Sequence, residues 1–238
     1  MRAVILVGGL GTRLKPFTEV IPKPLLPIGE KSLLEIQIDR LKQHGFDQIY
    51  LATNYKSEYI NNFFGDGSRY GVELKISKEA KPLGTVGPVT LLREVLTEPF
   101  VLMNGDILST IDFRKFYRHA CSVQADLCVA IKKIASVFDF GRIRHDGDYV
   151  TAIEEKPDLE IEVMAGIYVL KPGIFNLIPP QTYYGMDTLI KHMLGQGLPV
   201  AKYDMHEIWL DIGQLPDYER AQDVYRTHFS GTGEESAG

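Results

Sequence analysis

The sequence predicts an α/β fold, in which helices pack on a mostly parallel, mixed central sheet. Segments with strand and helix patterns alternate along the chain, and a short apolar strand at the N-terminus opens directly into a glycine-rich turn. The length of 238 residues suits one large α/β domain. We therefore expect a single domain over residues 1–229 and a disordered tail over residues 230–238, which are rich in Gly, Ser and Glu.

The first half of the chain alternates strand and helix patterns from its N-terminus onwards. Leu34, Ile38 and Leu41 recur at helical spacing and predict one apolar face of an amphipathic helix. Gly45 then ends that pattern, as glycine often does at a helix C-terminus. The expected elements are a strand over 3–7, a helix over 32–44, a strand over 49–53, a helix over 57–64, a strand over 72–77, a helix over 87–96 and a strand over 100–104.

The second half begins with the same alternation and then becomes richer in strand and turn signals. Asp146-Gly147-Asp148 is typical of the tight turn of a β-hairpin. The expected elements are a helix over 113–121, a strand over 126–133, a strand-rich region over 138–170, a helix over 187–196, a strand over 200–205 and a helix over 216–225.

Composition and charge restrict the classes of function. A formal net charge of −5 argues against a general nucleic-acid binder, which would present a basic face, although it permits a local basic pocket for phosphates. No apolar run approaches the roughly 20 residues needed to span a bilayer. Cys121 and Cys128 could form at most one disulfide, and without a secretory signal reduced thiols are the simpler interpretation. We expect a cytoplasmic protein with no nucleic-acid or membrane partner.

The glycine-rich segment from Gly8 to Leu14 is the first candidate site. Glycines let backbone N–H groups approach a phosphate, but on their own they indicate no more than a tight strand-to-helix turn. Arg13 and Lys23 favour a nucleotide site, because their side chains suit phosphate oxygens. The segment lacks the Gly-Lys-Ser or Gly-Lys-Thr of a P-loop, and Leu14 is too large for the last position of the dinucleotide fingerprint.

Two aspartates far apart in the sequence share a similar context. Asp106 follows the apolar run 101–103, and Asp211 follows Trp209-Leu210. Ligands of parallel α/β sheets collect at the carboxyl ends of the strands, and two carboxylates there would suit Mg²⁺ together with substrate phosphates. A single Asp after a strand is more often a turn former or a helix cap, so the argument depends on the pair.

The segment from Gly8 to Pro24 resembles the signature of sugar-1-phosphate nucleotidylyltransferases, G-G-x-G-T-R-L-x-P-x-T followed by P-K-P, at every fixed position. The resemblance extends to about Tyr218 and is closest in pattern to mannose-1-phosphate guanylyltransferase-like enzymes. It implies a three-layer, Rossmann-like fold of the nucleotide-diphospho-sugar transferase type. It also implies Mg²⁺-dependent transfer of a nucleoside monophosphate from an NTP to a sugar-1-phosphate, which yields an NDP-sugar and pyrophosphate.

The same resemblance implies roles for the charged residues. Asp106 and Asp211 match the two positions that hold the catalytic Mg²⁺ in this family. Arg13, Lys23 and Asp106 would be the catalytic residues. Arg13 would hold the β- and γ-phosphates as they become pyrophosphate, and Lys23 would lie near the α-phosphate. The nucleotide-binding residues would be Leu6, Gly8, Gly9, Gly11, Thr12, Arg13, Gly84 and Thr85.

A separate cluster would bind the sugar phosphate. Taken alone, the segment 154–157 indicates a solvated charged turn before a proline. The resemblance identifies it with the family's E-K-P, so Glu155 would accept sugar hydroxyls and Lys156 would hold the sugar phosphate. Gly141 would be a backbone contact to the sugar. Met164 stands where the family often has Asn or Thr, so it is not assigned to the site.

The loop 82–87 indicates which base is bound. Its sequence, P-L-G-T-x-G, is similar to that of mannose-1-phosphate guanylyltransferases, so GTP and a mannose- or heptose-type sugar are favoured. The alternatives are a dTTP-, UTP- or CTP-dependent glucose-1-phosphate nucleotidylyltransferase, a transferase for a non-sugar phosphate such as phosphocholine, and a non-catalytic regulatory homologue. A homo-oligomer is possible. Because the chain ends soon after Asp211, we expect no C-terminal β-helix domain.

Overall fold

The computed structural model describes residues 1–9, 11–54, 57–137, 140–156 and 158–230. The expected tail therefore lies outside the described residues, apart from Ser230. Within the described ranges, no helix is long and apolar enough to cross a membrane.

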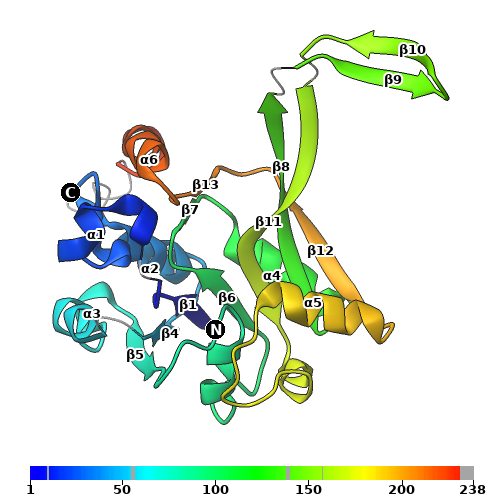
Figure 1. Cartoon of the computed structure of the whole chain (residues 1–238). Coiled ribbons are helices and arrows are strands. Elements are labelled where there is room, and N and C mark those ends of the chain that lie inside the picture. The colour runs from blue at the N-terminus through cyan, green and yellow to red at the C-terminus, as the bar shows by residue number, and fades with distance from the viewer. Residues whose placement is uncertain (10, 55–56, 138–139, 157, 231–238) are drawn as a thin grey trace.

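A mixed sheet of seven strands forms the centre of the molecule (Figure 1), in the order β12-β8-β11-β6-β1-β4-β5. Strands β6, β1, β4 and β5 pair in parallel, β12 pairs in parallel with β8, and β11 runs antiparallel to both of its neighbours. This arrangement confirms the expected α/β class and the mostly parallel, mixed sheet. The strands are β1 Arg2–Leu6, β4 Gln48–Thr53, β5 Glu73–Lys78, β6 Phe100–Asn104, β8 Leu127–Val137, β11 Asp158–Leu170 and β12 Val200–Met205.

Apolar residues cover both faces of this sheet. Ala3 and Ile5 of β1 join one buried cluster with residues of the first helices, whereas Val4 joins a second cluster with Leu189 on the opposite face. A near-continuous apolar strand is expected where both faces are buried, which explains the run 3–7 in the sequence. The helices are α1 Phe17–Val20, α2 Leu33–Gln43, α3 Ser57–Phe64, α4 Phe113–Ser122, α5 Met186–Gly195 and α6 Leu215–His228.

The expected helix over 87–96 is wrong in type and length. Residues Gly87–Leu92 form a 3₁₀ helix, η4. The Thr90 hydroxyl donates to the Gly87 carbonyl at 2.7 Å. A side chain therefore occupies an acceptor that an α-helix would use for a backbone N–H. The other 3₁₀ helices are η1 Thr12–Leu14, η2 Lys23–Leu25, η3 Ser68–Tyr70 and η5 Pro172–Asn176.

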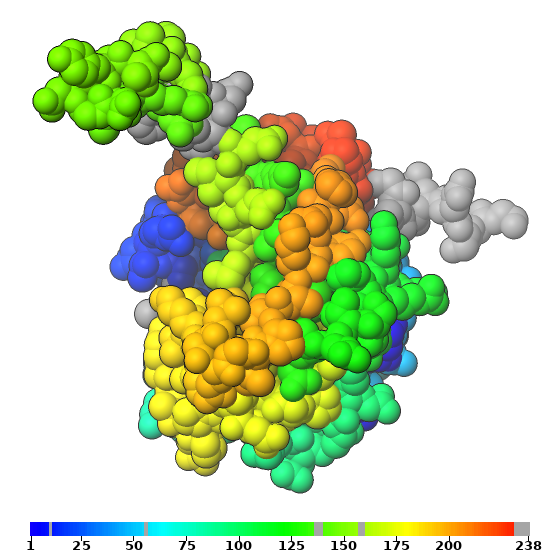
Figure 2. Space-filling model, turned by 90° about the vertical axis from the view of Figure 1, so that its right-hand side faces the viewer, coloured from blue at the N-terminus to red at the C-terminus, as the bar shows by residue number. Residues whose placement is uncertain are grey.

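Three short strand pairs lie outside the central sheet. The expected hairpin is confirmed: β9 and β10 pair around Gly147, which has a φ of 55°. This hairpin projects from the rest of the molecule in both views (Figures 1 and 2). The two other pairs were not expected from the sequence. The strands are β2 Pro27–Ile28 with β3 Lys31–Ser32, β7 Ile107–Ser109 with β13 Trp209–Asp211, and β9 Arg142–Asp146 with β10 Tyr149–Glu154.

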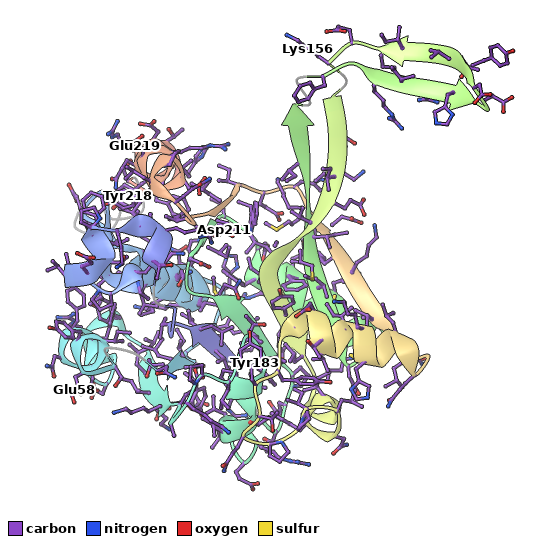
Figure 3. The ribbon with its side chains drawn as sticks, in the orientation of Figure 1. Glu58, Lys156, Tyr183, Asp211, Tyr218 and Glu219 are labelled. Atoms are coloured by element: carbon purple, nitrogen blue, oxygen red, sulfur yellow. The ribbon has the colours of Figure 1, made fainter. Side chains whose placement is uncertain are left out.

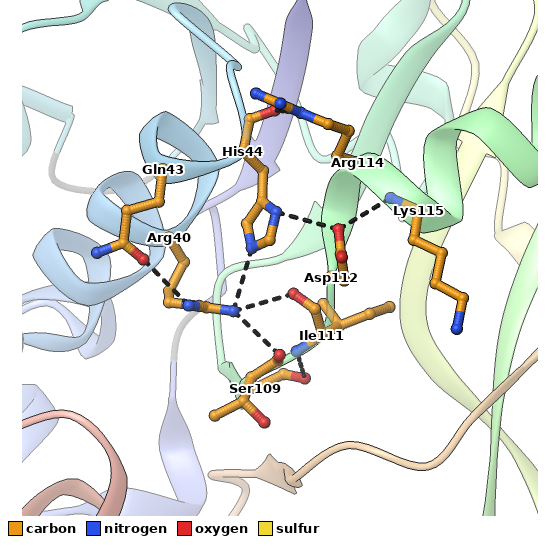
Figure 4. Close-up of polar contacts among 9 residues, drawn as sticks. Arg40, Gln43, His44, Ser109, Ile111, Asp112, Arg114 and Lys115 are labelled. Carbon is orange, nitrogen blue, oxygen red and sulfur yellow. Dashed lines mark hydrogen bonds and ion pairs between the residues drawn. The ribbon is translucent and has the colours of Figure 1, made fainter.

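A polar cluster joins α2 to the start of α4 (Figure 4). His44 Nδ1 lies 3.1 Å from Asp112 Oδ1, and His44 Nε2 lies 3.2 Å from Arg40 Nη2. Asp112 also caps α4 by accepting from Lys115 N at 2.9 Å. Burial and the nearby Arg40 guanidinium lower the pKa of His44, against the opposing effect of Asp112. The geometry therefore fits a neutral imidazole that donates from Nδ1 and accepts at Nε2.

This cluster makes the free energy of unfolding depend on pH. The pKa of His44 is lower in the folded than in the unfolded chain, so its stabilising contribution is present above about pH 6.5 and is lost as the pH falls below that value. The free energy of unfolding, measured with urea at pH 8 and at pH 5, should fall between these two values. The fall should be smaller for His44→Gln than for the wild type. His206→Gln, at an exposed position, serves as the control and should follow the wild type.

Candidate functional site

A cavity of about 340 Å³ opens at the carboxyl ends of β1, β4, β5 and β6. This is the edge of an α/β sheet where ligands collect. Six of the residues proposed from the sequence lie on its wall: Leu6, Gly8, Gly9, Gly84, Thr85 and Asp106. The rest of the wall is formed by Ala52, Asn54, Glu79, Pro82, Leu83, Asn104, Gly105 and Tyr183.

The turn between β6 and β7 is held from two sides, and it carries Asp106. The Gly105 N–H donates to Leu6 O at 2.9 Å, and a Cβ at Gly105 would lie 2.5 Å from that oxygen. From α2, the buried Gln37 Nε2 donates to Ile107 O at 2.8 Å and to Asn104 O at 3.1 Å. These contacts fix the backbone on each side of Asp106, so its carboxylate is presented from a rigid support.

Lys23 is the direct partner of Asp106. Its Nζ lies 2.6 Å from Asp106 Oδ2, although the two residues are 83 positions apart in the sequence. Only 8% of Lys23 is exposed. A buried ammonium needs a charged or polar partner to offset its lost hydration, and Asp106 supplies one. The P-K-P segment and the Asp after β6 therefore form one structural unit.

Asp211 reaches the same place through a short strand pair. It lies opposite Ile107 in the β13–β7 ladder, and the Ile212 N–H donates to Asp106 O at 2.9 Å. Lost hydration and the negative charge of Asp106 raise the pKa of Asp211, while Lys23 and Arg13 act in the opposite direction. Two carboxylates and two cations therefore act on one another at this edge of the sheet, where Figure 3 labels Asp211.

Two residues before Arg13, Gly11 adopts a left-handed backbone conformation that favours glycine. Gly11 has a φ of 61°, and a Cβ there would lie 2.8 Å from Thr18 Cγ2. The Thr18 hydroxyl donates to Gly11 O at 2.8 Å, which ties the turn to α1. Arg13 extends towards Gly213, where a Cβ would lie 3.4 Å from Arg13 Nη2. Gly11, Thr12 and Arg13 do not line the cavity itself. A Cβ at Gly11 would lie 3.3 Å from Lys23 Cβ, and the charge of Arg13 acts on Asp211.

Glu79 was not identified from the sequence, and it lies on the cavity wall. It follows β5 and is only 7% exposed. Its Oε2 accepts from Leu83 N at 2.8 Å, and its Oε1 faces Gly8, where a Cβ would lie 3.6 Å away. Burial raises the pKa of Glu79. The sequence does contain a signal for Glu79, because it is an acidic residue directly after a strand. Asp106 was proposed on the same kind of signal.

The loop over the cavity is joined to a distant segment of the chain. Tyr184 O accepts from the N–H groups of Val86 and Gly87, both at 3.1 Å. Gly84 has a φ of 83°, and a Cβ there would lie 2.6 Å from the same oxygen. Tyr183, the neighbour of Tyr184 in the sequence, is 69% exposed and lines the cavity (Figure 3).

The residues proposed for the sugar phosphate lie elsewhere. Gly141 and Glu155 are neighbours, since a Cβ at Gly141 would lie 3.3 Å from Glu155 Oε2. Figure 3 shows Lys156 at the base of the projecting hairpin, far from Asp211. None of Gly141, Glu155 and Lys156 lines the cavity. Within one chain, the fold assembles the proposed nucleotide residues and leaves the proposed sugar residues apart from them.

Asp106 and Asp211 fit a cation such as Mg²⁺, which needs few protein ligands. Among the described residues, no group of three or more His, Cys, Asp or Glu side chains is arranged to hold a metal. Mg²⁺ is commonly held by one or two carboxylates together with substrate phosphates and water, so a full protein cage is not required. Lost hydration, followed by repulsion from Asp106, raises the pKa of Asp211, and this repulsion is a reason for a cation to bind between the two carboxylates.

The chain is similar to known nucleotidyl transferases. Residues 2–228 match the family model described as nucleotidyl transferase. The UTP–glucose-1-phosphate uridylyltransferase of Synechocystis is 32% identical over 242 residues, which cover 93% of this chain and 62% of that protein. The D-glycero-alpha-D-manno-heptose 1-phosphate guanylyltransferase of Aneurinibacillus thermoaerophilus is 34% identical over 227 residues, covering 93% of this chain and 97% of that protein. The crystal structure of HddC from Yersinia pseudotuberculosis complexed with GMP-PN has a TM-score of 0.73 at 27% identity, covering 94% of this chain and 99% of that chain.

The tight approach at Gly84 is testable by substitution. We expect Gly84→Ala to destabilise the protein by about 2 kcal/mol or more, because it adds a collision with Tyr184 O to the cost of a positive φ. Gly65→Ala is the matched control, since Gly65 has a φ of 58° and nothing within 4 Å of its added Cβ. Equal losses in urea unfolding would mean that the contact with Tyr184 O is unimportant.

Proposed function

Because the chain belongs to the nucleotidyl transferase family, we propose that it transfers a nucleoside monophosphate from GTP to a sugar-1-phosphate of the mannose or heptose type. The products are a nucleoside-diphosphate sugar and pyrophosphate, and the reaction depends on Mg²⁺. The observation that carries the proposal is the junction of Lys23, Asp106 and Asp211 beside the cavity at the carboxyl edge of the sheet. We assign this activity to residues 1–229 as one catalytic unit.

The chemistry requires positioning and charge neutralisation rather than a side-chain nucleophile. A phosphate oxygen of the sugar-1-phosphate attacks the α-phosphorus of the nucleotide, the bond to the bridging oxygen breaks, and pyrophosphate leaves. Lys23 stabilises charge near the α-phosphate, and the Arg13 guanidinium holds the leaving pyrophosphate. Asp106 and Asp211 would hold Mg²⁺, which supplies neutralisation of the phosphate oxygens when bound.

The carboxylate of Glu79 favours guanine as the base. Guanine presents two neighbouring donors, N1–H and the N2 amino group, and a carboxylate accepts from both at once. Uracil and thymine offer one N–H on the corresponding edge. On the same wall, Asn54 Nδ2 is buried with no hydrogen-bond partner among the described residues, and it is suited to donate to a base carbonyl. The names of the Aneurinibacillus relative and of the HddC complex, which concern guanine nucleotides, favour the same base.

The second candidate is UTP with glucose-1-phosphate, which the name of the Synechocystis relative favours. Uracil also presents an N–H beside a carbonyl, so it would use one acceptor of Glu79 and the donor of Asn54. A panel of nucleoside triphosphates against mannose-, heptose- and glucose-1-phosphate separates the two candidates. Pyrophosphate release without any sugar-1-phosphate would contradict both of them, and release with phosphocholine would indicate a non-sugar acceptor.

The metal assignment is tested by removing one charge. Asp211→Asn keeps the size of the side chain, and we expect it to lower pyrophosphate release by about 100-fold or more at saturating Mg²⁺. Asp204→Asn is the matched control, because Asp204 is an exposed carboxylate on β12 that pairs with Lys202. Activity of Asp211→Asn within threefold of the wild type would remove Asp211 from the proposed metal site.

The base assignment is tested by Glu79→Gln, which replaces one acceptor oxygen by an amide donor. We expect kcat/KM for GTP to fall by about 10- to 100-fold, the range for one hydrogen-bonded contact of this kind, and kcat/KM for UTP to fall less. Parallel measurement of thermal unfolding shows whether the loop has been disturbed, since Glu79 also accepts from Leu83 N. Equal losses for the two nucleotides would show that Glu79 supports the loop without reading the base.

A further inference from the structure

Tyr183 is an aromatic side chain on the cavity wall that remains largely open to solvent. It is 69% exposed, and the cavity that it lines also contains Glu79 and Gly84. The described residues offer the Tyr183 side chain no hydrogen bond, no ring contact and no cation. Aromatic side chains bury a large area when they are packed, so an open one inside a cavity is available to a ligand.

The backbone on both sides of Tyr183 is fixed to the loop over the cavity. After it in the chain, the Tyr184 N–H donates to Leu83 O at 2.9 Å, and Tyr184 O accepts from the Gly87 N–H at 3.1 Å. Before it, Thr182 O approaches the same loop, since a Cβ at Gly87 would lie 2.8 Å from that oxygen. The main chain that carries Tyr183 is therefore held by the loop on either side, and the side chain starts from a fixed position on the wall.

Two further contacts attach the same segment to α5. Gly185 precedes this helix and has no side chain to cap it, and the loop supplies the cap instead, because the Thr85 hydroxyl oxygen accepts from Met186 N at 2.8 Å. Further along α5, His192 Nδ1 lies 2.9 Å from the Tyr184 hydroxyl. The loop 82–87, the segment 182–185 and the start of α5 therefore form one unit (Figure 3). A wall that is fixed in this way is preorganised for a rigid ligand.

The rest of the wall suits a planar ligand that is polar at its edge. Glu79 and Asn54 offer an acceptor and an unpartnered donor, and Pro82 and Leu83 add apolar surface. A base that is bound at its edge alone leaves both of its faces to water, whereas an aromatic ring on the wall can cover one of them. Stacking of a base on an aromatic side chain strengthens binding for every base, because each base has a π-face.

We propose that Tyr183 is a nucleotide-binding residue whose ring stacks on the base that Glu79 and Asn54 contact at its edge. This inference rests on the proposed function, because it concerns the nucleotide of the same reaction. Glu79 then selects the base, whereas Tyr183 strengthens the binding of any base. A purine covers more of the phenol ring than a pyrimidine does, so the stacking contact also favours GTP over UTP.

The stacking is tested by calorimetry with GTP and Mg²⁺ and without a sugar-1-phosphate, so that no turnover occurs. We expect Tyr183→Ala and Tyr183→Leu to raise the Kd for GTP by about 10-fold or more, and Tyr183→Phe to keep the wild-type Kd, because the ring is the part that stacks. The Kd for inorganic tripolyphosphate, which has no base, should be unchanged in all three variants. Tyr149→Ala is the matched control, since Tyr149 is 80% exposed and does not line the cavity.

Three results would overturn the stacking. If Tyr183→Leu binds GTP as tightly as the wild type, bulk rather than an aromatic ring is what the site needs. If the Kd values for GTP and tripolyphosphate rise equally, the substitution disturbs the phosphate site and not a contact with the base. If the Kd for GTP is unchanged while the KM for the sugar-1-phosphate rises, the ring contacts the sugar.

The variant Tyr183→Trp gives a direct optical signal. GTP should quench the fluorescence that this variant adds to that of the single native Trp209, and tripolyphosphate should not. Tight binding of GTP without such quenching would contradict a stacked ring. A wild type that binds GTP and turns over no sugar-1-phosphate would contradict the proposed function, and the binding measurements would still decide the role of Tyr183. A wild type that binds no nucleoside triphosphate would contradict both.

Discussion

The ion pair between Lys23 and Asp106 is the contact on which the arrangement of the site depends. It joins the segment after the glycine-rich turn to the end of the central strand β6, with 2.6 Å between the charged atoms. Because Lys23 is almost fully buried, removing the carboxylate would leave an ammonium without its counter-charge, which is costly in a protein interior. The pair therefore stabilises the turn and at the same time fixes a cation where phosphates are expected to bind.

Several glycines and one glutamine make that contact possible. Gly105 allows the chain to pass Leu6 O at a distance that no side chain would permit, and Gln37 holds the carbonyls on both sides of Asp106. The β7–β13 pair then sets Asp211 beside Asp106 through backbone hydrogen bonds alone. The carboxylates are thus positioned by the main chain of the sheet edge, which moves less than a loop side chain would. Such rigidity suits a reaction that relies on orientation and charge.

The strands and helices were largely predictable because their signals are local. The apolar run 3–7 and the turn at Asp146-Gly147-Asp148 act within a few residues, and the structure contains the elements they predict. The 3₁₀ helix at Gly87–Leu92 was not predicted, because the contact of the Thr90 hydroxyl with the Gly87 carbonyl leaves no mark in the helical pattern. The proximity of Asp106 and Asp211 could only be proposed, since it depends on a pairing of two three-residue strands that have too few residues to show a pattern.

Glu79 shows a different limit of the sequence. A glutamate directly after a strand is a weak signal by itself, and the burial of Glu79 and its place on the cavity wall are what distinguish it. The hairpin is the opposite case: its turn was predictable from Asp146-Gly147-Asp148, whereas the β8–β11 ladder pairs segments that are far apart in the sequence and share no local pattern. Sequence patterns and the family resemblance therefore proposed the residues, and tertiary structure decided which of them line one cavity.

Charge within the site explains why protein cations alone are insufficient for the proposed reaction. Lys23 and Arg13 are the cations beside Asp106 and Asp211, and the formal charges of these four side chains cancel. A nucleoside triphosphate and a sugar phosphate would each bring further negative charge to the same edge of the sheet. The charges of Lys23 and Arg13 are already balanced by the two carboxylates, so they oppose only part of this added charge, and phosphate oxygens repel an incoming phosphate strongly. The balance of charges at the site is therefore a second reason, beside the ligands it offers, for the divalent cation that we propose.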